Sequence, residues 1–175
     1  RSRDYWISCL INPSAGREFE WGGDRFTPAA TPRKLLVVGA GPAGLEAARA
    51  AAERGHSVEI VEALPQIGGQ FRLAGQQPRR AQILDLMEWY ERQFTKLGVT
   101  LRLNAFLDAD EIAAHPADTV ILATGSLPDE NAFQRWLPQE PCLPGLENGH
   151  VHSPEAVLRR EARLFAAVER RTQAF

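Results

Sequence analysis

Short apolar runs alternate along the chain with longer segments of helical period. Residues 34–38, KLLVV, lie between a proline-containing linker and a glycine, which predicts a buried strand. Residues 42–55 predict a helix, with Pro42 in its first turn and Gly55 at its end. Residues 57–63, in which apolar and polar positions alternate, predict a second strand. A strand, a helix and a strand in so short a segment require a parallel pair joined by a right-handed crossover.

The same alternation continues toward residue 125. Residues 79–97 predict the longest helix, because apolar side chains recur there at helical period. These side chains belong to Ile83, Met87, Tyr90, Phe94 and Leu97. Residues 99–104 predict a third strand, residues 109–115 a short helix and residues 118–125 a fourth strand. The fourth strand is apolar throughout, so we expect it to be central in the sheet. With the strands numbered in chain order, we predict the order 3-2-1-4, an α/β, Rossmann-like, doubly wound parallel sheet.

Composition divides the chain into three parts. Residues 1–33 are polar and rich in glycine, proline and arginine, which predicts an extended arm. Residues 34–158 form the predicted nucleotide-binding domain, which includes a proline-rich loop at 126–150 and a helix with Ser153 as its N-cap. Residues 159–175 follow as a terminal helix or tail. We therefore expect one domain with two loose ends.

The bulk composition excludes several classes of function. The chain has 44% hydrophobic and 24% charged residues and a formal net charge of −2 at pH 7. This balance is typical of a globular domain and gives no electrostatic reason to expect nucleic acid or an anionic membrane as a partner. No apolar run approaches the roughly 20 residues needed to span a bilayer. Two distant cysteines and four histidines without metal-ligand spacing predict that this chain alone holds no metal.

The strongest motif joins the first strand to the first helix. Gly39, Gly41 and Gly44 fit the spacing G-x-G-x-x-G, with Pro42 and Ala43 between them. The first glycine permits a tight turn, the second lets the backbone approach a pyrophosphate, and the third lets helix and strand pack closely. The helix N-terminus then offers free N–H groups and the positive end of its dipole to the phosphates. The position of the motif between a predicted strand and helix favours a dinucleotide site.

Glu62, at the end of the second predicted strand, extends this interpretation. It follows the motif at the distance where a carboxylate accepts hydrogen bonds from both ribose hydroxyls. A 2′-phosphate beside this carboxylate would be repelled by roughly 4 kcal/mol at an effective dielectric constant near 20, which disfavours NADP. The alternative interpretation is an ordinary solvated residue at a strand end.

Two further stretches of sequence favour FAD over NAD as the bound cofactor. QIGGQF, with Gly68 and Gly69, follows Glu62 closely, and ILATG ends the fourth strand at Gly125. Both resemble sequences of flavoproteins with two dinucleotide domains, where the first domain holds FAD. A flexible turn and a plain strand end are the alternatives. The candidate cofactor-binding residues are Gly39, Gly41, Pro42, Ala43, Gly44, Glu62, Ala63, Gly68, Gly69, Gln70, Ala123, Thr124 and Gly125.

From about residue 8 to 158 the chain resembles the C-terminal half of the trimethylamine dehydrogenase and 2,4-dienoyl-CoA reductase family of NADH:flavin oxidoreductases. The resemblance rests on SCLINPSAGRE, LLVVGAGPAGLEAARAAAERGHSVEIVEA, IGGQFRLA, DTVILATGS and HVHSPEAVL. It implies a parent protein with an FMN-bearing barrel, a [4Fe–4S] cluster and two nucleotide domains. One branch keeps ADP where the others keep FAD. LPDENAFQRWLPQEPCLPGL is similar to an insertion in the branch that demethylates N-methylated amino acids.

The resemblance also gives a role to one cysteine. Cys9 falls where the family places its fourth cluster ligand, and the other three ligands lie upstream of this chain, so the arm at 1–33 would follow the iron–sulfur segment. One thiolate cannot build a Cys₄ site, so the fragment is expected to be metal-free. The alternative for Cys9 is a small apolar residue in an extended arm. Cys142 matches no family position.

Both ends of the chain differ from those of a complete family member. Position 1 is not methionine, which we interpret as an internal cut or a processed start. After VLRREARL the family would begin a second glycine-rich strand, whereas this chain continues FAAVERRTQAF, as expected for a cut or a natural truncation. The arginines of this last segment are interpreted as the solvated face of a terminal helix.

We predict the FAD-binding domain of a multidomain iron–sulfur flavoprotein oxidoreductase. In the parent, electrons would pass between FAD and FMN through the cluster, and the fragment alone would be inactive. No residue has the setting of a catalytic acid, base or nucleophile, because the cofactor carries the chemistry. The alternative is a non-catalytic ADP-binding module, and a simple NAD dehydrogenase ranks last. The expected partners are the nucleotide and the remaining domains of the parent, and the family chemistry implies a cytoplasmic location.

Overall fold

The structure is a computed structural model that describes residues 9–22, 26–77, 79–127, 131, 135–140, 142, 144–148 and 152–159. Its contacts divide the chain into two compact units, Arg1–Gly125 and Ser126–Phe175. We describe each unit by itself. The predicted domain boundary at residue 158 stays a prediction.

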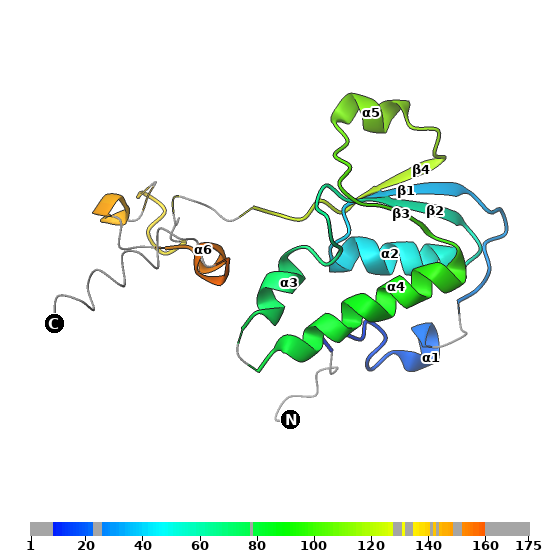
Figure 1. The fold of residues 1–175 in the computed structure, drawn as a ribbon, viewed down its shortest axis with the longest axis horizontal. Helices are drawn as coiled ribbons and strands as arrows, with labels where there is room; N and C mark the ends of the chain where they lie inside the picture. The colour runs from blue at the N-terminus through cyan, green and yellow to red at the C-terminus, as the bar shows by residue number, and fades with distance from the viewer. Residues whose placement is uncertain are drawn as a thin grey trace. The chain divides into compact units, whose positions relative to one another are not determined.

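The first unit is built on a parallel sheet (Figure 1). Its strands are β1 (Lys34–Val38), β2 (Ser57–Val61), β3 (Thr100–Arg102) and β4 (Thr119–Leu122). The order is β3-β2-β1-β4 and every neighbouring pair is parallel, so the predicted order and the Rossmann-like fold class are confirmed. All four strands therefore end at the same edge of the sheet, which is where ligands bind in such folds.

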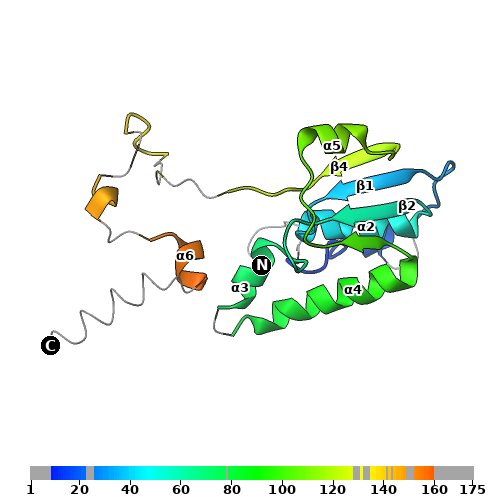
Figure 2. The same ribbon diagram turned by 45° about the horizontal axis from the view of Figure 1, so that its top comes forward.

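Helices cover both faces of this sheet (Figures 1 and 2). On one face lie α2 (Pro42–Glu53) and α4 (Asp85–Leu97), and on the other lies α5 (Ala109–Ala114). The short helix α3 (Gln70–Gly75) and the 3₁₀ turn η1 (Ala81–Leu84) connect β2 to α4. Gly98 ends α4 in a left-handed conformation with φ 69°, as glycine allows without strain.

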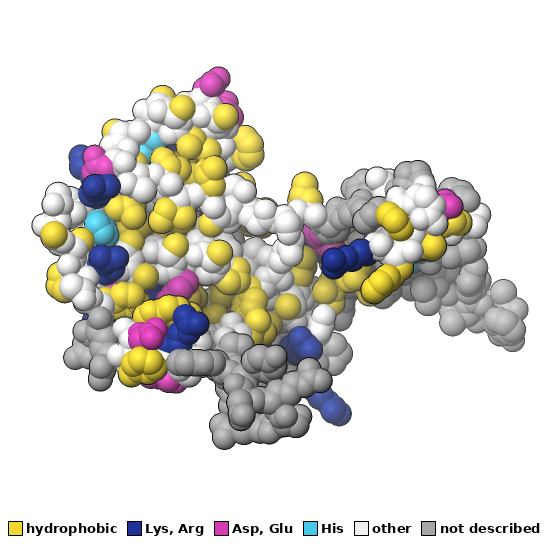
Figure 3. Space-filling view, turned by 180° about the vertical axis from the view of Figure 1, so that it is seen from behind, with side chains coloured by type: hydrophobic (Ala, Val, Ile, Leu, Met, Phe, Trp, Pro, Cys, Tyr) yellow, Lys and Arg dark blue, Asp and Glu magenta, His cyan; other side chains and the backbone are white. Residues whose placement is uncertain are grey.

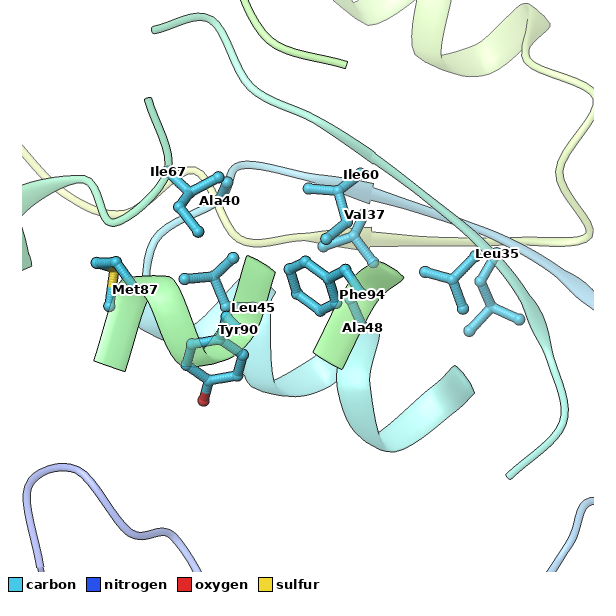
Figure 4. Close-up of a cluster of buried hydrophobic side chains, with 11 residues drawn as sticks. Leu35, Val37, Ala40, Leu45, Ala48, Ile60, Ile67, Met87, Tyr90 and Phe94 are labelled. Atoms are coloured by element: carbon cyan, nitrogen blue, oxygen red, sulfur yellow. The ribbon is translucent and has the colours of Figure 1, made fainter. Parts of the chain in front are cut away.

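The larger core lies between the sheet and the α2–α4 layer. Figure 4 shows Leu45 and Ala48 of α2 facing Val37 and Ile60 of the sheet. From α4, the predicted stripe buries Met87, Tyr90 and Phe94, while Ile83 and Leu97 are only partly buried. A smaller core of Leu36, Val38 and Val61 lies on the α5 face. On the surface seen from behind, hydrophobic side chains are visible among the polar ones (Figure 3).

Three expectations about the elements need correction. The helix predicted over 79–97 begins as 3₁₀ at Ala81, because Arg79 takes a left-handed φ of 66° that no α-helix accepts. The arm at 1–33 contains the short helix α1 (Glu18–Trp21). The fourth strand is not central: among the described residues β4 pairs only with β1, and Leu122 is 68% exposed. Its apolar sequence reflects what packs on its faces, not how many strands flank it.

The second unit holds two short elements, η2 (Leu146–Asn148) and α6 (Pro154–Leu158). Ser153 caps α6 as predicted, and its hydroxyl accepts a hydrogen bond of 3.1 Å from the Ala156 N–H. The tail predicted over 159–175 lies outside the described residues, apart from Arg159. Within the described parts of the chain, no helix has the length and apolar character that crossing a membrane requires.

Candidate dinucleotide site

Gly39 and Gly44 fix the turn from β1 into α2. Gly39 has φ 102°, and a Cβ on it would collide with the carbonyl oxygen of Ala123 at the end of β4. A Cβ on Gly44 would collide with the carbonyl oxygen of Gly39 itself. Neither obstacle is a movable side chain, so both positions need glycine for the strand and helix to approach.

Gly41 has a different environment from its two neighbours in the motif. A Cβ built on Gly41 would meet no heavy atom of the described residues within 4 Å. Its φ of −73° is open to any residue, so neither strain nor packing explains a glycine here. Gly41 is the N-cap of α2, with Pro42 as the first helical residue, so the open space lies at the helix N-terminus. The space next to Gly41 is thus suited to an anion such as pyrophosphate.

Glu62 lies at this edge with a role that its position in the sequence did not reveal. Its side chain is buried, and the residue is only 8% exposed. One carboxylate oxygen accepts a 2.7 Å hydrogen bond from the Ala40 N–H, and the other accepts 2.9 Å from the Leu64 N–H. The carboxylate therefore ties the glycine loop to the end of β2. Each oxygen retains lone-pair capacity for a ribose hydroxyl.

The second glycine pair lies against the first loop. The Gly68 N–H donates to the Ala40 carbonyl at 2.7 Å, and a Cβ on Gly69 would lie 3.5 Å from the Cα of Gly41. Both glycines have positive φ values, 108° and 48°. The loop is therefore hydrogen-bonded to the motif at Ala40, and its role in cofactor binding stays a prediction.

The end of β4 completes this edge. The Ala123 N–H donates to the Val38 carbonyl at 2.8 Å, which places Ala123 beside Gly39. Gly125 has φ 78° and no protein atom near its Cβ position, and Thr124 between them is exposed. Ala63 and Gln70 are exposed next to Glu62 and Gly69. The predicted residues from four separate segments thus gather at the carboxyl edge of the sheet.

The cysteines and histidines do not gather in this way. Cys9 is exposed and Cys142 partly buried, and both are thiols. No group of three or more histidine, cysteine, aspartate or glutamate side chains is placed to hold a metal ion in the described ranges. A [4Fe–4S] cluster takes four cysteine ligands, so the described residues, which include two cysteines, do not fit one.

The fold and the glycine loop together define a dinucleotide-binding domain of the oxidoreductase class. Residues 22–115, more than half of the chain, match the family described as pyridine nucleotide-disulphide oxidoreductase, and the chain belongs to this family. The predicted function is confirmed at this level.

Similar proteins place the family match in a narrower group. A probable N-methylproline demethylase of Rhizobium meliloti (strain 1021) is 45% identical over 127 residues, which is 73% of this chain and 19% of that protein. An N,N-dimethylglycine/sarcosine dehydrogenase of Chromohalobacter salexigens is 43% identical over 131 residues, covering 74% and 19%. The solved structure of 6-hydroxypseudooxynicotine amine oxidase from Pseudomonas geniculata N1 superposes with a TM-score of 0.79 at 36% identity, covering 87% of this chain and 23% of that chain.

These findings confirm the resemblance to the trimethylamine dehydrogenase and 2,4-dienoyl-CoA reductase family of flavin oxidoreductases. They also support a flavin as the cofactor of the group. The chain spans about a fifth of the length of the curated relatives that it matches.

Proposed function

We propose that the chain binds FAD at the carboxyl edge of its sheet and serves as the FAD domain of a larger amine-linked or NAD(P)H-linked oxidoreductase. The observation that carries the proposal is the contrast within the glycine motif. Gly39 and Gly44 are required by protein atoms, whereas among the described residues no heavy atom lies within 4 Å of a Cβ built on Gly41. A ligand that comes close to the protein backbone at Gly41, where a side chain would block it, accounts for this difference.

Three groups of candidate residues would share this binding. The N-terminus of α2 at Gly41, Pro42 and Ala43 would face the pyrophosphate, and the Glu62 carboxylate would accept from the adenosine ribose. Gly68, which donates a hydrogen bond to the motif at Ala40, and Gly69, which lies next to Gly41, would close the other side. When bound, the isoalloxazine ring of FAD supplies the electron transfer.

A second candidate function is a structural ADP module. It is favoured by one observation: the contacts that define the site, at Gly41, Ala40 and Glu62, all suit the pyrophosphate and ribose that FAD and ADP share. The parent's FMN, its cluster, the direction of electron flow and a cytoplasmic location follow from the resemblance and remain predictions.

The test has two stages. The purified protein is first denatured, and any released nucleotide is identified by chromatography and mass spectrometry after a visible spectrum. The stripped protein is then titrated calorimetrically with FAD, ADP and FMN. FAD binding that is tighter than ADP binding supports the FAD domain, and equal affinity supports the ADP module. FMN, which lacks the ADP half, serves as the control and should bind weakly.

The variant Gly41→Val tests the phosphate position. A branched side chain would fill the open space at Gly41, so we expect FAD and ADP affinity to fall about 100-fold or more, since every roughly 1.4 kcal/mol is tenfold. Thermal unfolding should be almost unchanged, because no protein atom lies within 4 Å. Unchanged affinity with an intact fold would contradict the proposed site.

A further inference from the structure

A cavity in the first unit, whose lining does not include the glycine loop, is formed by residues of the N-terminal segment, α2 and α4. The ribbon shows α1 of this segment on the same side of the sheet as α2 and α4 (Figures 1 and 2). The volume of the cavity is about 420 Å³, within the range of sites that hold small ligands. Residues 11–14 and Trp21 form one side, and Leu86 and Trp89 of α4 form the other. Glu46, Arg49 and Glu53 of α2 form its floor. We call this cavity the indole groove.

The floor of the indole groove is a fixed ion network. Arg49 donates to both carboxylate oxygens of Glu46 at 2.8 and 2.6 Å and to Oε1 of Glu53 at 2.6 Å. The Arg49 side chain is 9% exposed, whereas those of Glu46 and Glu53 are 25% and 24% exposed. Solvent in the groove therefore meets the carboxylates more than the guanidinium.

The charge of this network is negative at neutral pH. The hydrogen bond to Glu46 raises the pKa of Arg49 further above its usual value, so this residue stays positive. Burial raises the pKa of Tyr90, whose neutral hydroxyl donates to Glu46 at 3.0 Å. Two carboxylates against one guanidinium leave an excess of one negative charge. Both carboxylate oxygens of Glu46 accept hydrogen bonds from Arg49. Of the two Glu53 oxygens, Oε1 accepts from Arg49, and Oε2 has no hydrogen-bond partner among the described residues.

The walls of the groove favour positive charge as well. Trp21 is 44% and Trp89 36% exposed. Each indole already holds a guanidinium near its ring, Arg17 at 4.8 Å from Trp21 and Arg49 at 5.6 Å from Trp89, measured to the ring centroids. An indole has two faces, and both attract cations through the ring quadrupole. Ile11, Pro13 and Leu86 add apolar surface between the two rings.

We propose that the indole groove binds an organic cation with an apolar body, through the Glu53 carboxylate and the rings of Trp21 and Trp89. An alkylammonium group of a free small amine and the guanidinium of an arginine side chain both present this chemistry. An anion is disfavoured, because three N–H groups of Arg49 already donate to carboxylates. The groove is separate from the glycine loop, so the proposal stands or fails independently of nucleotide binding.

The test is an NMR titration of the intact chain with tert-butylammonium chloride at constant ionic strength. The chain has four tryptophans, so the indole N–H signals are few enough to assign by substitution. We expect saturable shifts of the Trp21 and Trp89 signals and none at Trp136, which lies in the other unit and is 90% exposed. tert-Butanol has nearly the same shape without charge and should bind at least tenfold more weakly. A parallel titration with N-acetylarginine amide identifies the source: whichever cation binds tighter, the free amine or the arginine side chain, is the better model of the natural ligand.

Two variants give the proposal its sharpest form. Glu53→Gln keeps the shape and removes one charge, so affinity for tert-butylammonium should fall about tenfold, the loss expected for one charged contact. Glu59→Gln is the matched control, because its side chain is 27% exposed and lies on β2 beside Arg102, outside the groove lining. Trp21→Leu keeps an apolar wall and should weaken the cation a few-fold while leaving tert-butanol unchanged.

The proposal would be overturned by any of three results with the fold intact. The first is an absence of saturable shifts at Trp21 and Trp89. The second is equal binding of tert-butanol and tert-butylammonium. The third is an affinity in Glu53→Gln that equals that of Glu59→Gln. Backbone amide spectra of each variant establish that the fold is retained.

Discussion

The two halves of α2 are held in place by different kinds of contact. Its N-terminal turn depends on missing side chains, since Gly39 and Gly44 leave no room for a Cβ. Its second half depends on side chains, since Glu46, Arg49 and Glu53 form a network that reaches Tyr90 on α4. The first arrangement is fixed by backbone atoms and tolerates no side chain at Gly39 or Gly44. The second is made by flexible groups at the edge of solvent, so it can be weakened without loss of the fold.

The difference shows what kind of contact places a ligand site. A turn fixed by backbone atoms holds its N–H groups in one orientation before the ligand arrives, which lowers the cost of binding. A side-chain network contributes charge and links α2 to its neighbours. Substitutions in the two halves should therefore differ in size and in the property that they change.

Gly44→Ala should have the largest effect. The added Cβ would press on the Gly39 carbonyl, so β1 and α2 must separate, at a cost of about 3 kcal/mol in the free energy of unfolding. Denaturant unfolding followed by circular dichroism measures this loss. Gly41→Ala is the matched control and should change stability by at most about 1 kcal/mol, the cost of a poorer N-cap, because its surroundings are open. Equal stabilities of the two variants would refute the steric account of the turn.

Glu62→Ala should come next. It removes the acceptor of the Ala40 and Leu64 N–H groups, and the buried Ala40 N–H then lacks a partner, which costs about 2 to 3 kcal/mol of stability. Nucleotide affinity should fall as well, by about 1.5 to 3 kcal/mol, if the carboxylate also accepts from the ribose. Calorimetric titration and unfolding separate the two effects. Stability that falls with unchanged affinity would limit Glu62 to the structural role.

Arg49→Met should destabilise the chain by about 1 to 2 kcal/mol. The apolar stem keeps its packing, but Glu46 and Glu53 lose their shared cation and repel each other. Their partial exposure lets water offset part of this loss. Arg92→Met is the control, because the Arg92–Glu88 pair is 3.6 Å apart and exposed, and it should cost less than about 0.5 kcal/mol. The same loss in both variants would mean that the network is no stronger than a surface pair.

Tyr90 gives the smallest effect, visible at high pH. Burial raises the pKa of Tyr90 above its unfolded value, which is about 10. Its contribution to stability is therefore complete below about pH 10 and declines as the pH rises toward the folded pKa, by at most about 1.4 kcal/mol per pH unit. Tyr90→Phe should flatten this decline between about pH 10 and 11. Identical pH profiles of the wild type and Tyr90→Phe would contradict the raised pKa.

The sequence predicted those features that local pattern controls. The glycine spacing and the apolar runs were sufficient for the βαβ unit and the strand order, because backbone sterics and parallel crossovers leave few alternatives. The Ser153 cap of α6 was predicted for the same reason, since a cap involves only neighbouring residues. The start of α4 was missed, because the left-handed Arg79 has no signature in composition.

Features set by distant parts of the chain were not foreseen. The hydrogen bond from Ala40 to Glu62 joins residues 22 positions apart, and from the sequence only a ribose contact was expected for Glu62. The spacing of Glu46, Arg49 and Glu53, three and four residues apart, could have indicated ion pairs on one helix face. The position of this ion network next to the N-terminal segment could not have been inferred, because the position depends on how residues 9–22 pack.

The outer edge of β4 affects how the protein behaves in solution. Among the described residues, the outer side of β4 carries no neighbouring strand, and Leu122 is exposed beside it. A bare apolar strand edge is a template on which another chain can add a strand. In concentrated solution, molecules of this chain should therefore associate along β4, to an extent that rises with protein concentration. A charged residue in place of Leu122 should prevent this association.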